Sequence, residues 1–224
     1  MEEREFLLTT QLFRGMTQEE ISGILSCLGA DRRRFYKGAF LHRRGEELHS
    51  VGIILAGQVH ILEEDFWGNR TILGEVSPRQ MFGESYACLP GEPLAVDVRA
   101  VEDTTVLYLK MDRILHPCSN ACSFHGRLME NMTAVLARKN WLLTRKMEHL
   151  SRRTTRDKVL SYLSDQSRTM GSAKFFIPFD RQQLADYLSV DRSALSAELS
   201  KLRKEGVLEY RKNWFRLLEQ PTVG

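Results

Sequence analysis

The feature that most constrains the fold is a long run of helical periodicity between residues 119 and 153. Apolar side chains recur there three, four or seven residues apart: Met129, Met132, Leu136, Leu143, Met147 and Leu150. The run contains one glycine and no proline, so nothing in it ends a helix. A helix of about thirty residues would be roughly 45 Å long, more than one small domain can cover. We therefore expect one long helix. The apolar side chains form one stripe along this helix. The stripe could pack lengthwise on its own domain, but we favour the interpretation that it forms the seam of a dimer.

The residues before this helix have the pattern of a small antiparallel β domain. Between residues 32 and 115, short runs of Val, Ile, Leu and aromatic residues alternate with regularly spaced glycines. Strands at this spacing, with turn signals between them, are typical of a barrel or a sandwich. Val59–Leu62 and Thr71–Leu73 predict a hairpin with its tip at Gly68–Asn69.

Helices and strands are also expected at the two ends of this β domain. Residues 5–30 carry apolar side chains at helical spacing and predict a helical lead-in. Thr17, followed three residues later by Glu20, predicts a capping box for its second helix. Residues 98–100 and 104–109 are expected to be the last strands before the long helix.

The densest local signal in the chain lies between residues 180 and 206. Asp180 and Gln183 have the spacing of a capping box, which predicts a helix over residues 181–188. Asp191 is expected to cap a second helix, and Gly206 to end it. Only three residues separate the two helices, which is the connection typical of a helix-turn-helix.

The exposed face expected for the second helix suits a DNA groove. Opposite its three core leucines lie Arg192, Ser193, Ser196, Ala197, Ser200 and Lys201. Short polar side chains without acids allow a helix to enter the major groove and to hydrogen-bond with base edges. Residues 208–218 predict a β-hairpin wing with a basic tip. The competing interpretation is an ordinary solvent-facing helix, and the wing and the charge distribution favour DNA.

Charge is distributed unevenly along the chain. From residue 151 onward there are 14 Lys and Arg against 9 Asp and Glu, a net charge of +5. The first 150 residues hold 18 against 20, a net charge of −2. A basic C-terminal third is what a nucleic-acid surface requires, because neutralised phosphates release counterions.

The sequence also bounds the class of protein. It has no apolar run long enough to cross a bilayer, and its acidic first residues lack a secretory segment, so we expect a cytoplasmic protein. Four cysteines in 224 residues do not predict a disulfide framework. No P-loop, nucleophile elbow or catalytic carboxylate pair is present, so we do not expect an enzyme.

The whole chain from about residue 10 to residue 218 resembles the Crp/Fnr family of bacterial transcription regulators. The resemblance is carried by Lys37-Gly38, Arg44-Gly45-Glu46, Ala56-Gly57-Gln58-Val59, Gly68-Asn69, Phe82-Gly83-Glu84, Val98-Arg99-Ala100, the run from Leu184 to Ser196, and Leu202-Arg203-Lys204-Glu205-Gly206. The order and spacing of these motifs are specific, whereas any one of them alone would not be.

This resemblance implies an α+β protein with three parts. They are a helical lead-in with an antiparallel β-roll (jelly-roll) effector domain over residues 1–118, a dimerisation helix over 119–153, and a winged helix-turn-helix over 154–224. It further implies a homodimer that binds pseudo-palindromic double-stranded DNA under the control of an effector, with RNA polymerase as a candidate partner. The effector, any cofactor and the operator are not identified by the sequence.

The effector segment departs from the family pattern. Cyclic-AMP-binding members follow the Phe-Gly-Glu segment with an Arg-Ser pair that holds the cyclic phosphate, and Leu94 and Ala95 stand in those places here. A phosphate buried without such partners would lose its hydrating water, and no hydrogen bond or opposite charge would compensate for that loss. We therefore expect an uncharged or apolar effector rather than cAMP. The candidate pocket residues are Glu84, Leu94, Ala95, Leu143 and Thr144.

Cysteine and histidine residues gather just before the long helix. Cys118, Cys122, His116 and His125 could supply a zinc site or a redox couple, although the spacing matches no established zinc motif. Packing or capping roles are the favoured interpretation. No cysteine precedes Cys27, so the N-terminal iron–sulfur cluster of the oxygen-sensing branch is not expected.

These arguments assign roles on the DNA-binding surface. Arg192, Ser193, Ser196 and Lys201 are expected to read base edges, and the residues expected to contact phosphates are Arg181, Gln182 and Lys212. Two alternatives remain open. One is a redox- or metal-sensing regulator that uses Cys118 and Cys122, and the other is a ligand-binding signalling module that does not bind DNA.

Overall fold

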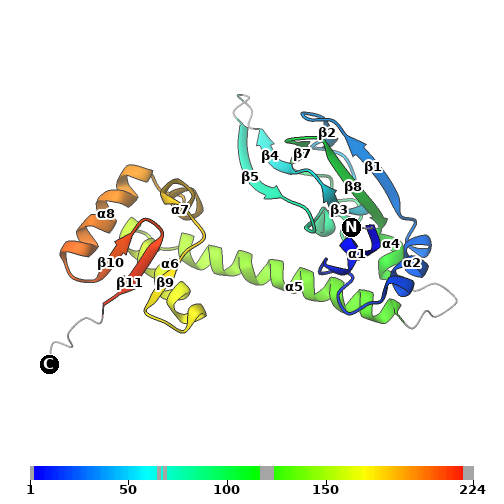
Figure 1. The fold of residues 1–224 in the computed structure, drawn as a ribbon. Helices are drawn as coiled ribbons and strands as arrows, with labels where there is room; N and C mark the ends of the chain where they lie inside the picture. The colour runs from blue at the N-terminus through cyan, green and yellow to red at the C-terminus, as the bar shows by residue number, and fades with distance from the viewer. Residues whose placement is uncertain (1–2, 65–66, 68–69, 117–123, 219–224) are drawn as a thin grey trace. The chain divides into compact units, whose positions relative to one another are not determined.

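The computed structural model describes residues 3–64, 67, 70–116 and 124–218. The chain divides into two compact units, Met1–Arg138 and Lys139–Gly224, and the boundary falls inside helix α5 (His125–Leu150). Figure 1 labels most of the elements of both units.

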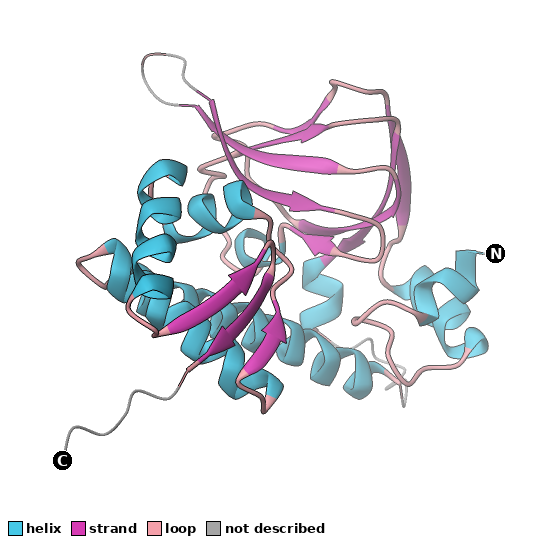
Figure 2. Ribbon diagram, turned by 60° about the vertical axis from the view of Figure 1, so that its left-hand side comes forward, coloured by secondary structure: helices cyan, strands magenta, loops and turns pink. Residues whose placement is uncertain are grey.

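The first unit is built around two four-stranded antiparallel sheets, shown in magenta in Figure 2. One sheet has the order β1-β8-β3-β6 and the other β2-β7-β4-β5. The strands are β1 (Asp31–Phe35), β2 (Phe40–His42), β3 (Ser50–Ala56), β4 (Val59–Glu64), β5 (Arg70–Val76), β6 (Met81–Phe82), β7 (Asp97–Ala100) and β8 (Thr104–Lys110). The predicted hairpin is present as β4 paired with β5, and its tip at Gly68–Asn69 lies outside the described residues.

The central strands β3 and β8 of the first sheet are buried on both faces. Successive side chains of a strand point in opposite directions, so each of these strands contributes to two layers of packing. Val106 and Tyr108 of β8 pack with residues of the second sheet, in the interior of the roll. Leu107 and Leu109 of the same strand pack on the helices of the unit. The near-continuous apolar runs of β3 and β8 are explained by this double burial.

Besides α5, the described residues of this unit form the helices α1 (Glu3–Leu8), α2 (Gln18–Cys27), α3 (Glu84–Ala87) and α4 (Met111–Leu115). The capping box predicted for α2 is confirmed. The Glu20 backbone N–H donates to the Thr17 hydroxyl over 3.2 Å, and the Glu20 carboxylate accepts from the Thr17 backbone N–H over 2.7 Å.

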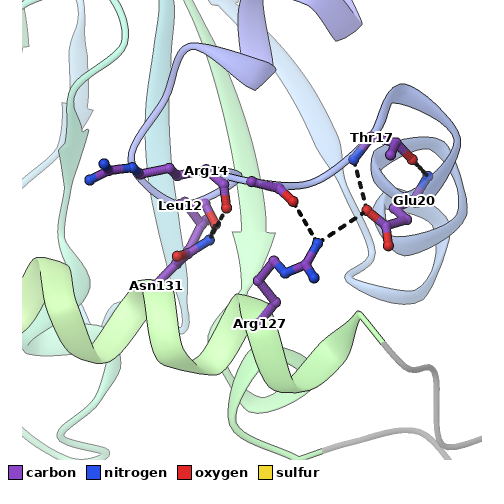
Figure 3. Close-up of polar contacts among 7 residues, drawn as sticks. Leu12, Arg14, Thr17, Glu20, Arg127 and Asn131 are labelled. Carbon is purple, nitrogen blue, oxygen red and sulfur yellow. Dashed lines mark hydrogen bonds and ion pairs between the residues drawn. The ribbon is translucent and has the colours of Figure 1, made fainter.

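The helical lead-in is fastened to α5 by polar side chains, as Figure 3 shows. Arg127 donates to the Gly15 carbonyl over 2.5 Å and lies 3.7 Å from the Glu20 carboxylate. Asn131, one turn further along, donates to the Leu12 and Arg14 carbonyls over 2.9 Å each. The first half of α5 is therefore tied to the N-terminal unit by hydrogen bonds as well as by apolar packing.

The apolar stripe of α5 divides into two parts with different surroundings. Met132 is 1% exposed and packs in the core of the first unit with Leu128 and Val135, two residues that the stripe did not include. The assignment of Met132 to a dimer seam is therefore wrong, because its own unit already covers it. In the second half the stripe is open, since Leu143 is 62% and Met147 is 68% exposed.

The second unit contains the end of α5, then α6 (Thr155–Met170), α7 (Arg181–Leu188), α8 (Arg192–Lys204) and a small sheet of order β10-β11-β9. Its strands are β9 (Lys174–Phe176), β10 (Leu208–Arg211) and β11 (Trp214–Leu217). The core contains fully buried leucines from α6, α7 and α8, together with Phe175 and Phe215 from the sheet.

The observed bounds agree closely with the expected ones in this unit. Helix α7 has the predicted range, and α6 ends at Met170, where Gly171 follows with φ 61°. The last turns of α6 contain Asp165, a buried polar residue that forms an ion pair with Arg145 and that apolar periodicity does not predict. Among the described residues, no helix combines the length and the apolar character needed to cross a membrane.

Candidate nucleic-acid interface

Helix α7 begins at the capping box that the sequence predicted. The Asp180 carboxylate accepts from the Gln183 backbone N–H over 2.8 Å, and the Gln183 side-chain oxygen accepts from the Asp180 backbone N–H over 2.9 Å. These two bonds satisfy donors that a helix start leaves without partners. Asp191 occupies the N-cap position of α8, as expected, but in the described structure its side chain makes no capping hydrogen bond to that helix.

The turn between α7 and α8 is held from three sides. Ser189 adopts the left-handed region with φ 50°, and the Val190 backbone N–H donates to the Ala185 carbonyl over 3.0 Å. Lys158 of α6 donates from its ammonium group to the Leu188 carbonyl over 3.2 Å. A cation at the C-terminal end of a helix satisfies an unpaired carbonyl and complements the helix dipole. The angle between the two helices is thus determined by backbone bonds and by α6.

Apolar packing holds α8 against α7. Leu184, Ala185 and Leu188 of α7 and Leu195, Leu199 and Leu202 of α8 are at most 1% exposed. The small Ala185 allows the two helices to approach closely. Burial of one face of α8 leaves the opposite face to the solvent, which is the arrangement of a helix that reads DNA.

The outward face of α8 carries the residues predicted to contact bases. Arg192, Ser193 and Lys201 are exposed, and Ser196 is half-buried. The Ser196 hydroxyl donates to the Arg192 carbonyl one turn earlier over 2.8 Å, so its proton is used within the helix. Its oxygen retains lone pairs, and Ser196 can therefore still accept a hydrogen bond from a base.

The acidic residues of α8 and its C-terminal cap are paired with α6. Arg156 lies 3.3 Å from the Glu198 carboxylate and 2.7 Å from that of Glu205. One arginine thereby compensates two negative charges that would otherwise repel phosphates. The sequence alone did not show that these acids had a common partner.

The N-terminal ends of α7 and α8 and the wing tip surround one concavity of about 710 Å³. Its lining residues are Pro178, Phe179, Asp180, Arg181, Gln182, Gln183, Arg192, Lys212 and Asn213. Four of the seven residues predicted to contact DNA are among them. Ser193, Ser196 and Lys201 follow along α8 outside this concavity.

Arg181 and Lys212 are held in place by the wing. The Arg181 guanidinium lies 5.1 Å from the centre of the Tyr210 ring, and burial lowers its pKa, with nearby Arg192 adding to the effect and Tyr210 opposing it. An arginine nevertheless stays charged at neutral pH. Lys212 occupies the hairpin turn with φ 55°, between β10 and β11. Gln182 is positioned by its own helix rather than by the wing, because its amide donates to Asp186 over 2.8 Å.

Sequence reasoning missed three residues that build this surface. Tyr210 supports Arg181 and also Arg203, which lies 5.2 Å from its ring. Asn213 lines the concavity and donates to the Ile177 carbonyl over 3.2 Å, which ties the wing to the segment before α7. Lys158 closes the turn. Only Asn213 had a local signal, as a turn former beside the basic tip.

The residues predicted for an effector pocket fall in both units. Glu84 is buried at the start of α3, directly after Gly83, whose φ of 80° and tight contact with Leu48 leave no room for a side chain. Leu94 is 2% exposed, and the Tyr86 hydroxyl accepts from the Ala95 backbone N–H over 3.4 Å, which links that segment to α3. Leu143 and Thr144 belong to the second unit and are exposed.

Of the cysteine–histidine cluster, only the two histidines are described, because Cys118 and Cys122 lie outside the described residues. His116 is exposed, with its Nδ1 2.9 Å from the Asp112 carbonyl. His125 is buried and donates from Nε2 to the Ile114 carbonyl over 3.0 Å, which fastens the start of α5 to α4. The described residues contain no group of three or more metal-ligating side chains.

Two family models match this chain. The model of the cyclic nucleotide-binding domain matches residues 32–120, and that of the Crp-like helix-turn-helix domain matches residues 157–221. One match falls in each of the two units.

Known proteins are similar to this chain over most of their length. The cyclic AMP receptor protein of Thermus thermophilus is 27% identical over 88% of this chain and 87% of its own, and the transcriptional activator FnrL of Cereibacter sphaeroides is 24% identical over 79% and 71%. Among solved structures, the c-di-GMP responsive global regulator CLP of Xanthomonas campestris aligns with a TM-score of 0.57 at 19% identity, covering 91% of this chain and 100% of that chain. A CooA mutant of Carboxydothermus hydrogenoformans has the same TM-score and identity, covering 92% and 88%.

Proposed function

Because this chain belongs to the Crp/Fnr family of DNA-binding transcription regulators, we propose that it binds a pseudo-palindromic promoter site as a homodimer and that an effector controls this binding. The observation that carries the proposal is the surface at the ends of α7 and α8, where Arg181, Gln182, Arg192 and Lys212 line one concavity. Basic side chains beside an acid-free helix face are suited to a groove flanked by phosphates.

We assign different tasks to the residues of this surface. Arg192, Ser193, Ser196 and Lys201 lie along α8 and read base edges in the major groove. Arg181 and Lys212 contact phosphates on either side of the groove and so set the register of the protein on the duplex. Gln182 contributes a weaker phosphate contact, since Asp186 already accepts from its amide.

The second half of α5 is the proposed dimer seam. Trp141, Leu142, Leu143 and Met147 are each between 48% and 68% exposed in the isolated chain. Leu143 and Met147 lie one turn apart on the same face of the helix, and a second copy of the helix would cover this face and remove apolar surface from water. In this proposal residues 1–118 bind the effector, residues 119–153 dimerise, and residues 154–224 bind DNA in the cytoplasm, where RNA polymerase is available as a partner.

The proposed effector is not cAMP. Leu94 and Ala95 offer no cation or hydroxyl to a cyclic phosphate, and Leu94 is buried while its backbone bonds to Gly45 and Glu46. An uncharged or apolar ligand near Glu84, Leu94 and Ala95 would change the affinity of the protein for DNA. A thermal-unfolding titration tests this, because cAMP should leave the unfolding temperature unchanged. An increase that saturates with cAMP would contradict the proposal.

Selection of genomic fragments by the purified protein, followed by sequencing, tests the DNA-binding function. We expect an inverted repeat with half-site centres about 10 bp apart. The selection is run with and without reductant, so that a redox sensor using Cys118 and Cys122 would be recognised by a change in the enriched fragments. Failure to enrich any repeat under both conditions would favour a signalling module that does not bind DNA.

Two variants then test the assigned contacts on the recovered site. Arg192→Ala should relax the preference at one base pair, by about 1–3 kcal/mol of discrimination. Lys212→Ala should weaken binding to all sequences alike and reduce the salt slope by about one. If both variants weaken all sequences equally, Arg192 contacts phosphate rather than a base and its assignment is wrong.

A further inference from the structure

A second basic concavity lies in the C-terminal unit and shares no residue with the DNA-binding surface. It occupies the turn between α5 and α6 and one face of α6, with a volume of about 620 Å³. Its lining residues are Ser151, Arg152, Arg153, Asp157, Leu160, Ser161, Ser164 and Arg168. We call it the α6 groove. Three arginines and three serines line it, against a single carboxylate.

The cationic groups of the α6 groove are available to a ligand. Arg152 and Arg153 are exposed and form no ion pair within the described part of the chain. Arg168 lies 3.8 Å from the Asp165 carboxylate, but its side chain is 78% exposed and Asp165 is already paired with Arg145. The three guanidinium groups therefore retain most of their hydrogen-bonding capacity.

The single carboxylate of the groove is already engaged in capping α6. Asp157 accepts from the Thr154 hydroxyl over 2.7 Å, and the Asp157 backbone N–H donates to the same hydroxyl over 3.1 Å. This arrangement places an acid in the first turn of α6, where it complements the helix dipole. Asp157 thus has a structural partner and reduces the positive charge of the groove only in part.

One wall of the groove is fixed by buried side chains. The Ser161 hydroxyl is 2.9 Å from Nδ1 of His149, which is 3% exposed and has its other ring nitrogen 3.7 Å from Asp165. The His149 ring packs edge-on against Tyr162 at 5.7 Å. Ser161 is therefore held in position by the core of the unit, and a ligand would meet one prearranged hydroxyl among exposed arginines.

We propose that the α6 groove binds a phosphate group, carried either by a small phosphorylated molecule or by the backbone of DNA outside the operator. Arginine forks and serine hydroxyls are the side chains that recognise phosphate oxygens. The N-terminal end of α6 adds the positive end of a helix dipole. The volume is sufficient for a nucleotide-sized ligand.

The first test uses inorganic pyrophosphate and the full-length protein, and it does not depend on the proposed function. Isothermal titration should show saturable binding that weakens at least tenfold in the double variant Arg152→Ala/Arg153→Ala. The matched control is Arg4→Ala/Arg14→Ala, which removes two exposed arginines of the other unit. Its affinity should equal that of the unchanged protein. Circular dichroism verifies the fold of each variant, and Arg168→Gln, at the far end of the groove, provides a separate substitution.

The second test distinguishes the source of the phosphate. Affinity is measured for duplexes with the same selected site and short or long flanks, over a range of salt concentrations. If DNA occupies the groove, the Arg152→Ala/Arg153→Ala variant loses affinity only for the long duplex, and its salt slope falls by about two. If a small molecule occupies it, both duplexes bind as before and only pyrophosphate binding is lost.

The outcomes separate this inference from the proposed function. Failure of the unchanged protein to bind any duplex would contradict the proposed function. The pyrophosphate titration would then decide alone whether the α6 groove binds phosphate. If the double variant matches the Arg4→Ala/Arg14→Ala control for pyrophosphate and for both duplexes, the α6 groove is not a phosphate site.

Discussion

At the scale of single residues, polar side chains fulfil two different needs in this protein. Some satisfy buried backbone groups, as Asn131 and Lys158 do for carbonyls at the ends of other segments. Others remain exposed on the surface, as Arg152 and Arg192 do. A lysine or arginine in the sequence does not reveal to which group it belongs, because its partner is distant along the chain.

A pH dependence of stability is expected from His149. Burial lowers its pKa, and the charges of Arg145 and Arg152 lower it further, while Glu148 opposes them. The unfolded chain therefore binds a proton more readily than the folded one as pH falls through about 6.5, so stability decreases towards acidic pH.

Urea unfolding at pH 7.5 and pH 5.5 measures this effect. The stability loss between the two pH values should be smaller in His149→Gln than in the unchanged protein. His49→Gln is the control, because His49 is 73% exposed and its substitution should leave the loss unchanged. Since burial also lowers the pKa of His42 in the other unit, part of the loss should persist in His149→Gln. An identical loss in His149→Gln and the unchanged protein would refute the role of His149.

At the scale of elements, the two aspartates before α7 and α8 make a matched pair. Asp180 completes a capping box, whereas the Asp191 side chain makes no capping bond in the described structure. Asp180→Ala should lower the free energy of unfolding by about 1 kcal/mol, and Asp191→Ala by much less. Denaturant unfolding followed by circular dichroism compares them. Equal losses would show that the capping geometry is not what stabilises α7.

The contact between α6 and α8 should affect DNA affinity through charge. Arg156→Ala would release the carboxylates of Glu198 and Glu205, which Arg156 now compensates. Weaker DNA binding is expected, most clearly at low salt, where repulsion from phosphates is least screened. The double variant Arg156→Ala/Glu198→Gln should recover part of the affinity. If it binds no better than Arg156→Ala alone, the loss arises from helix packing and not from charge.

At the scale of the whole molecule, α5 belongs to both units. Its first half packs on the N-terminal unit and is hydrogen-bonded to it, and its second half carries the exposed apolar residues. The double variant Leu143→Glu/Met147→Glu should convert a dimer into a monomer. Because one monomer binds only one half-site, operator binding should weaken at least a hundredfold.

Sedimentation equilibrium and a DNA-binding titration test this expectation together. Leu73→Glu is the matched control, since Leu73 is 52% exposed on β5 and its substitution should leave assembly intact. A dimer that persists in the Leu143→Glu/Met147→Glu variant would place the seam elsewhere.

The sequence by itself determined the features that depend on neighbours three or four residues away. The bounds of α7, the capping boxes of Thr17 and Asp180, and the spacing of the leucines in α8 were all predicted. Helix periodicity and capping are local interactions, so the information for them lies within one or two turns. The β4–β5 hairpin was predicted for the same reason.

Only the tertiary structure decided which side chains already have partners within the protein. It showed that Met132 is covered by its own unit, that Arg156 compensates two acids, and that Tyr210 supports Arg181. It also brought Arg152 and Arg168, sixteen residues apart, to one groove. Such contacts join segments that are distant along the chain. Their formation depends on how the elements pack, and no local pattern of residues records that.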